Sequence, residues 1–139
     1  MLIRTLLLTL LAALAACSSP SGGSAQADLP QAQPDMGLVL FFRKASMKGK
    51  AIRFEITDTA EGSIGQLSSG TYIERDLAPG SHTFTARAPS LDGQDSITLK
   101  VEAGEVYYVE GEILWGFPTG RPKFKRTNAG LAGAALAKM

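Results

Sequence analysis

The sequence predicts an all-β protein, an antiparallel Ig-like or transthyretin-like sandwich of about seven to eight strands, from two observations. Apolar and polar residues alternate in several short runs, which is the two-residue period of a strand with one buried face. Turn residues separate these runs at intervals of about ten, a spacing typical of sandwiches and barrels. Once an expected leader and tether are set aside, about 100 residues remain, enough for one domain.

The first strand is apolar on both faces, and the later strands alternate. Leu38 to Phe42 carries no polar residue, which indicates an inner strand covered on both sides. Ile52, Phe54 and Ile56 alternate with polar neighbours, and Gly-containing turns such as Ala78-Pro79-Gly80 divide the later runs. We expect strands over residues 38–42, 52–57, 72–77, 81–88, 96–102, 105–114 and 123–127.

The C-terminal residues favour a short helix. Ala129 to Met139 is rich in Ala, and Asn128 is a suitable N-cap. Because the segment has two glycines and only eleven residues, we expect it to form only if it docks on the sheet.

The N-terminal residues are typical of an export signal. One positive charge, Arg4, precedes an apolar run that is too short to span a bilayer, so we interpret residues 1–16 as a signal peptide. Leu14-Ala15-Ala16-Cys17 resembles the bacterial lipobox, which implies cleavage before Cys17 and lipid on its sulfur. Residues 17–35, rich in Ser, Gly, Pro and Gln, are expected to be a disordered tether, which leaves residues 36–139 for the domain.

Composition excludes several kinds of site. The chain has 14 Lys and Arg against 13 Asp and Glu, a balance poorly suited to nucleic-acid binding. One Cys and one His exclude an internal disulfide, a Cys-rich zinc site and a two-His metal site. We therefore expect no metal, no cofactor and no nucleic-acid partner.

Four motifs in order carry a resemblance to a known family. They are Gly37-Leu38-Val39-Leu40-Phe41-Phe42-Arg43, Ile64-Gly65-Gln66-Leu67 with Gly70-Thr71-Tyr72, Leu77-Ala78-Pro79-Gly80-Ser81-His82, and Ala103-Gly104-Glu105-Val106-Tyr107-Tyr108-Val109. With a lipobox ahead of them, they resemble the domain of unknown function 2846 family of small bacterial lipoproteins. The resemblance implies an Ig-like or transthyretin-like sandwich in the cell envelope and no assigned reaction. The Pro-Gly-x-His segment also resembles PEGA-type surface modules.

Two groups of residues are candidates for catalysis, each with a structural alternative. His82 is either a general base or a histidine whose ring nitrogen bonds a nearby backbone carbonyl, and we favour the second. Glu110 and Glu112 share a strand face, where they suit acid–base work or calcium binding. Alternatively, the two glutamates form cross-strand pairs with Lys123, Lys125 and Arg126, and we favour this interpretation.

The candidate contact residues are Trp115, Phe117, Lys123, Lys125 and Arg126. The two aromatic residues lie in a Gly- and Pro-rich loop and either anchor a partner or fold back to plug the core, the alternative we favour. The basic residues either attract anionic headgroups or protect an edge strand, which again we favour. Tyr107 and Tyr108 point to opposite sides, so one of them is expected on the surface.

These features predict a non-enzymatic lipoprotein with a structural or interaction role. We expect it on the outer membrane, held by lipid on Cys17 and facing the periplasm, since Ser18 rather than Asp follows the Cys. The membrane is one partner and an envelope protein is a second candidate. Two alternatives stay open: an accessory lipoprotein of an envelope or secretion machine, and a small hydrolase or carbohydrate-binding protein.

Overall fold

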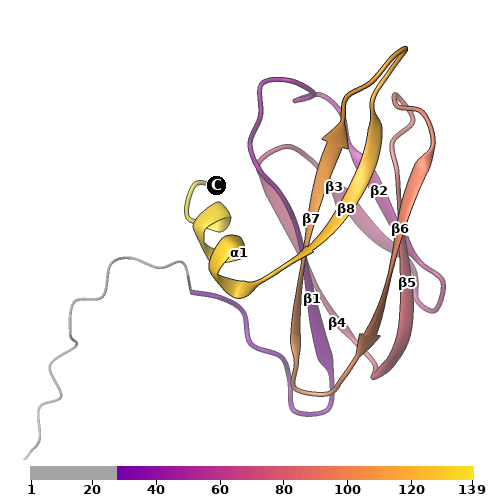
Figure 1. Cartoon of the computed structure of the whole chain (residues 1–139). Helices are drawn as coiled ribbons and strands as arrows, with labels where there is room; N and C mark the ends of the chain where they lie inside the picture. The colour runs from indigo at the N-terminus through magenta and orange to yellow at the C-terminus, as the bar shows by residue number, and fades with distance from the viewer. Residues whose placement is uncertain (1–27) are drawn as a thin grey trace, which may run out of the picture.

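The computed structural model describes residues 28–139, which form two four-stranded sheets packed face to face and one helix (Figure 1). The predicted signal peptide, Cys17 and the first part of the predicted tether lie outside the described residues. The first sheet has the order β4 (Thr71–Leu77), β1 (Gly37–Arg43), β7 (Val106–Leu114), β8 (Arg121–Thr127). The second has the order β3 (Gly62–Leu67), β2 (Phe54–Asp58), β5 (Gly80–Arg87), β6 (Gln94–Val101).

The predicted all-β sandwich is confirmed, and its strand order adds one feature that the sequence did not show. Six of the eight strands have only antiparallel partners, but β1 and β7 pair in parallel at the centre of the first sheet. The sequence runs did not include β3, whose six residues contain two glycines and only two large apolar residues, Ile64 and Leu67. A strand with so few side chains to bury leaves a weak alternating pattern.

The core lies between the sheets and is built from the inward-facing residues of both. Phe41 of β1 meets Phe84 of β5 edge to face, with ring centroids 5.0 Å apart, and also contacts Phe124 of β8. Tyr107 also points inward: its hydroxyl donates to Lys100 O and accepts from the backbone N–H of Glu102. These bonds resemble the tyrosine corner of Ig-type sandwiches and hold the β6–β7 connection against the core.

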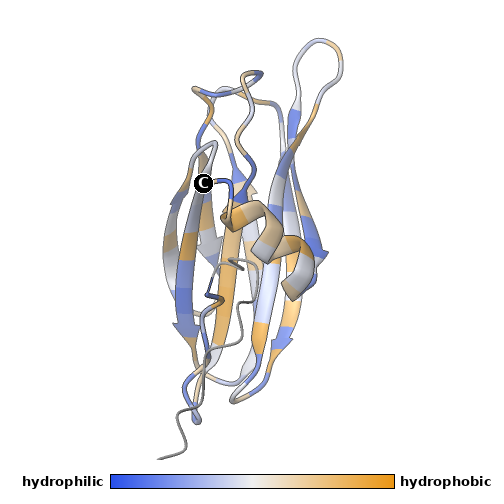
Figure 2. Ribbon diagram, turned by 90° about the vertical axis from the view of Figure 1, so that its left-hand side faces the viewer, coloured by the Kyte–Doolittle hydropathy of each residue, from blue (hydrophilic) through white to orange (hydrophobic). Residues whose placement is uncertain are grey.

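The outer face of β1 and β7 is covered by the C-terminal helix, α1 (Ala129–Leu136), which lies across the first sheet in Figure 2. Ala132 and Ala135 pack on Leu40, Phe42 and Tyr108, which explains why β1 is apolar on both faces. The predicted cap is confirmed, since Asn128 Oδ1 accepts from Leu131 N at 3.0 Å. Among residues 28–139, no helix is long and apolar enough to cross a membrane.

The helix also changes two expectations about exposure. Tyr108 was expected on the surface if Tyr107 faced the core, but α1 buries it, so both tyrosines are buried. Leu29, from the segment interpreted as a tether, packs on the same outer cluster and approaches Gly133 of the helix. The packed part of the chain therefore reaches back beyond Met36.

The loops at the two ends of the sandwich differ in charge. Four loops lie at the upper end of Figure 1, and we call them the basic end: residues 44–53, 68–70, 88–93 and 115–120, together with the flanking Leu114 and Arg121. The connections at the other end, the acidic end, are residues 34–36, 59–61, 78–79 and 102–105. The candidate site lies at the basic end.

Candidate functional site

Trp115 joins two loops of the basic end. The ring lies so close to Gly49 of the β1–β2 loop that a Cβ there would come within 3.0 Å of Trp115 Cζ2. On its other side a Cβ at Gly120 would lie 3.2 Å from Trp115 Cε3. Lys48 places its ammonium 4.4 Å from the ring centroid, within the range of a cation–π contact. Trp115 is thus held between the two loops while 45% of it stays exposed.

Other large apolar side chains of this end face solvent. Phe117, at the tip of the β7–β8 connection, is fully exposed at 101%, and Met47 of the β1–β2 loop is 86% exposed. Leu114, the last residue of β7, is also exposed. The expectation that Trp115 and Phe117 fold back to plug the core was wrong, because both side chains are exposed and neither belongs to the core between the sheets. Exposed aromatic residues of this kind commonly mark a contact surface.

A buried arginine fixes the β1–β2 loop from below. Arg43, the last residue of β1, donates to Ile52 O and to Gly49 O, the latter at 2.8 Å. Its guanidinium lies 4.9 Å from the centroid of Phe54. Burial lowers the pKa of Arg43 from its ordinary value, but an arginine still stays charged at neutral pH. The loop that carries Met47, Lys48 and Lys50 is therefore held by a buried cation and its carbonyl partners.

Asp92 ties the loop of residues 88–93 to the loop of residues 115–120. Asp92 N donates to Gly120 O at 3.2 Å, and Thr119 Oγ1 donates to Asp92 Oδ2 at 2.8 Å. Asp92 is the one acidic residue in the four loops. The Asp92 carboxylate accepts its hydrogen bond from Thr119, and this bond holds the tip of the β7–β8 connection in place.

The basic end carries cations with no acidic partner. Lys48, Lys50, Arg53 and Arg121 are all exposed. Within the described part of the chain, the ion pairs join Lys44 to Glu110, His82 to Asp58 and Lys123 to Asp95, and none involves those four residues. Exposed aromatic rings and unpaired cations thus occupy the same end of the molecule.

The Glu110 and Glu112 pair lies just below this end. The register places Glu110 opposite Lys125 and Glu112 opposite Lys123, as expected for a β7–β8 hairpin. However, Glu110 is buried and pairs with Lys44 of the β1–β2 loop at 2.9 Å. Lys44 directly follows β1, the strand on the other side of β7, and it pairs with Glu110 in place of Lys125. Both carboxylates line a shallow hollow of about 260 Å³ that also includes Lys48 and Trp115.

Three basic residues of β8 that the sequence suggested as contacts lie along the strand and not at the tip: Lys123, Lys125 and Arg126. Lys123 contacts Asp95 of β6 at 3.5 Å, and the Arg126 guanidinium lies 5.4 Å from the ring centroid of Tyr107. Lys125 is exposed on the outer face. β8 is an edge strand, as the edge-protection interpretation requires. Asp95 Oδ2 also accepts from Phe124 N at 2.7 Å, which satisfies part of that edge.

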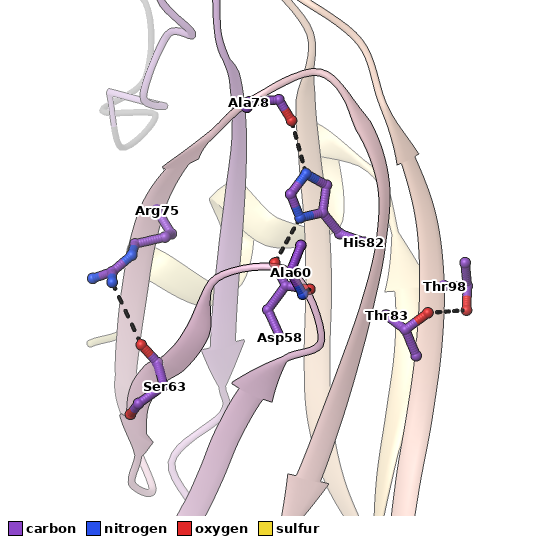
Figure 3. A network of polar contacts seen from close by, with 8 residues as sticks. All are labelled: Asp58, Ala60, Ser63, Arg75, Ala78, His82, Thr83 and Thr98. Carbon is purple, nitrogen blue, oxygen red and sulfur yellow. Dashed lines mark hydrogen bonds and ion pairs between the residues drawn. The ribbon is translucent and has the colours of Figure 1, made fainter.

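His82 lies toward the other end, with both ring nitrogens bound (Figure 3). Nε2 contacts Ala78 O at 2.7 Å, which agrees with the structural interpretation of His82, and Nδ1 contacts Asp58 Oδ2 at 2.6 Å. A carbonyl oxygen and an ionised carboxylate both accept, so the two ring nitrogens are placed as the two donors of an imidazolium. Burial lowers its pKa, but the bonds to Asp58 and Ala78 and the charges of Asp58 and Glu61 outweigh burial, and the pKa is raised.

The His82–Asp58 pair is a structural ion pair in this geometry. Both residues are 3% exposed, and Asp58 Oδ1 also accepts from Ala60 N at 3.2 Å. Asp58 was not among the residues that the sequence predicted for a site, because it and His82 come from different strands and are 24 positions apart. Nor were Met47, Lys48, Lys50 and Arg53 among those residues. The absence of Asp and Glu from residues 36–54 was the available signal for the three cations. In the portion described, no cluster of three His, Cys, Asp or Glu could hold a metal ion.

The fold and the site define a class: a small β-sandwich with a helix on one face and an exposed aromatic, basic end. Within that class the chain belongs to the family described as protein of unknown function (DUF2846), whose match covers residues 33–121. The resemblance seen in the sequence is thereby confirmed. Neither the curated proteins nor the solved structures gave a significant match.

Proposed function

We propose that this protein is a lipid-anchored lipoprotein of the bacterial outer membrane, with lipid on Cys17, whose sandwich makes a non-catalytic contact in the cell envelope. The observation that carries the contact role is the exposure of Trp115 and Phe117 at an end where four cations have no acidic partner. The order of charge, apolar run and Cys in residues 1–17 supports the anchor.

The geometry of His82 and Glu110 supports a contact role for the protein better than a catalytic role. A general base needs a free nitrogen toward its substrate, and both nitrogens of His82 are bound to groups of the chain itself. Glu110 is paired with Lys44, whose charge holds the carboxylate in place. The small-hydrolase alternative therefore has weaker support than the contact role.

The anchor is tested by labelling cells with a radioactive fatty acid and isolating the protein. We expect label on the wild-type chain and none on Cys17→Ser, which should accumulate as an unprocessed precursor. Ser21→Ala, a change in the same segment, is the matched control and should keep the label. A processed, unlabelled wild-type chain that is free in the periplasm would refute the proposal.

The contact role is tested by a photoreactive residue at Phe117 in cells, with the same residue at Glu102 of the acidic end as the control. We expect adducts at Phe117 and few at Glu102. A discrete protein adduct would favour the accessory role in an envelope machine, while equal yields at both positions would contradict a contact role for the basic end.

A further inference from the structure

The two ends of the sandwich have opposite charge, although the whole chain is almost neutral. Connections at the basic end carry Lys44, Lys48, Lys50 and Arg53, with Arg121 beside them and Asp92 as their one acid. Connections at the acidic end hold no Lys or Arg and expose Asp35, Glu61, Glu102 and Glu105. An anionic surface therefore attracts one end and repels the other, which gives the molecule a preferred orientation.

Exposed apolar side chains follow the same polarity. Of the seven large exposed hydrophobic residues, Met47, Leu114, Trp115 and Phe117 lie at the basic end, while Tyr72 lies on β4 and Leu131 and Met139 lie in the C-terminal segment. Trp and other aromatic residues favour the headgroup region of a bilayer, where the ring is partly buried and cations stay in water. A rim of Lys and Arg around such residues matches a surface of phosphate groups.

The described chain begins beside the first half of β4 and the end of the helix. Asp28 and Pro30 line a hollow with Tyr72, Glu74 and Leu136. Tyr72 pairs with Phe42 in the β1–β4 ladder, one step from the Arg43–Thr71 pair that ends it at the basic end. Ten residues lie between Cys17 and Asp28, and the eleven steps from one to the other limit their reach to about 37 Å. A lipid on Cys17 and the basic end can thus meet one bilayer.

We infer that the basic end docks on the anionic phospholipid headgroups of the membrane that holds the lipid anchor, with Trp115 and Phe117 entering the headgroup layer. This inference rests on the proposed function and names the partner of its contact site. Lys48, Lys50, Arg53 and Arg121 bind the phosphates, and the acidic end points away from the membrane. Lys123 and Arg126, farther along β8 than Arg121, take less part, because Lys123 pairs with Asp95 and Arg126 lies on Tyr107.

The test uses Trp115, since the chain has one tryptophan and its fluorescence reports that residue alone. The full lipidated protein is reconstituted in vesicles of phosphatidylcholine, with or without phosphatidylglycerol, that contain bromine-labelled acyl chains. We expect emission at shorter wavelength and strong quenching in the anionic vesicles, and little change in the neutral ones. High salt should reverse the effect, because it screens the attraction between charges.

Two substitutions measure the part played by charge. Lys50→Gln and Arg121→Gln should each lower the ratio of docked to undocked protein about fivefold, as expected for about 1 kcal/mol per cation near an anionic surface. Lys100→Gln, the same change on an exposed lysine near the acidic end, is the control and should leave the ratio unchanged. Phe117→Ser should reduce the quenching without a change in its salt dependence.

The inference is overturned if Trp115 responds equally in neutral and anionic vesicles, or if Lys50→Gln and Arg121→Gln behave like Lys100→Gln. It is also overturned if a photoreactive residue at Phe117 gives protein adducts in cells and no lipid adducts. A mass spectrum without acyl groups on Cys17 would instead refute the anchor. Docking would then be measured as co-sedimentation of the unacylated chain with the same vesicles, so the two failures are distinguishable.

Discussion

The acidic end and the basic end of this sandwich use charged residues for opposite purposes. Near the acidic end, His82 and Asp58 are buried and bound to each other, to Ala78 O and to Ala60 N. At the basic end, Arg43 is buried beneath a loop whose other cations, Lys48 and Lys50, stay in water. The comparison indicates that one end is arranged for stability and the other for contact, and the predictions below test that difference.

The largest effect is expected from Asp58→Ala at the acidic end. This change removes the hydrogen-bonded counter-ion of the buried His82 ring, so the free energy of unfolding should fall by about 3 kcal/mol or more. Urea denaturation followed by circular dichroism measures it. Glu61→Ala removes an exposed carboxylate from the same turn and should cost much less. Equal losses for the two variants would contradict a structural ion pair.

The same ion pair predicts a pH dependence of stability. The pKa of His82 is raised in the folded protein, so its contribution is fully present below the unfolded value of about 6.5. It decreases as the pH rises through the higher, folded value. The difference in unfolding free energy between wild type and His82→Gln should therefore shrink with rising pH. A difference that grew over that range would show that the neutral ring is the stabilising form.

A smaller effect is expected from Gly49→Ala, with Gly62→Ala as its control at the acidic end. Both glycines have positive φ angles, 78° and 83°, so each alanine should cost about 1 kcal/mol from backbone conformation. At Gly49 the Cβ also meets Ile113 Cδ1 at 2.7 Å and Trp115 Cζ2 at 3.0 Å, whereas at Gly62 it meets nothing within 4 Å. Gly49→Ala should therefore cost more and alter Trp115 fluorescence. Equal costs and an unchanged spectrum would show that Trp115 does not pack there.

The smallest effect on stability is expected from Phe117→Ala. The ring is fully exposed, so the free energy of unfolding should change by less than about 0.5 kcal/mol. Phe84→Ala, which empties a buried position between the sheets, should cost about 3 kcal/mol or more. Thermal or urea unfolding separates the two. A large loss for Phe117→Ala would mean that the loop supports the core.

Much of the fold could be predicted because alternation is a local signal. The runs at 52–57, 81–88 and 96–102 each show one buried and one exposed face, and each became a strand close to its expected bounds. β3 was missed because Gly62 and Gly65 leave few side chains to alternate. That omission matters for the site. Successive strands run in opposite directions along the sandwich. A strand count that is wrong by one would therefore place residues 44–53 and 115–120 at opposite ends, whereas the correct count places them at the same end.

The sequence by itself determined the alternating strands (though not β3), the helix cap at Asn128 and the family, because each depends on neighbouring residues. The tertiary structure decided the parallel pairing of β1 with β7, the burial of Tyr108 under α1 and the partner of His82. It also decided the charge polarity. Net charge is a sum over the chain and has no direction, whereas a field depends on which loops the topology places at each end.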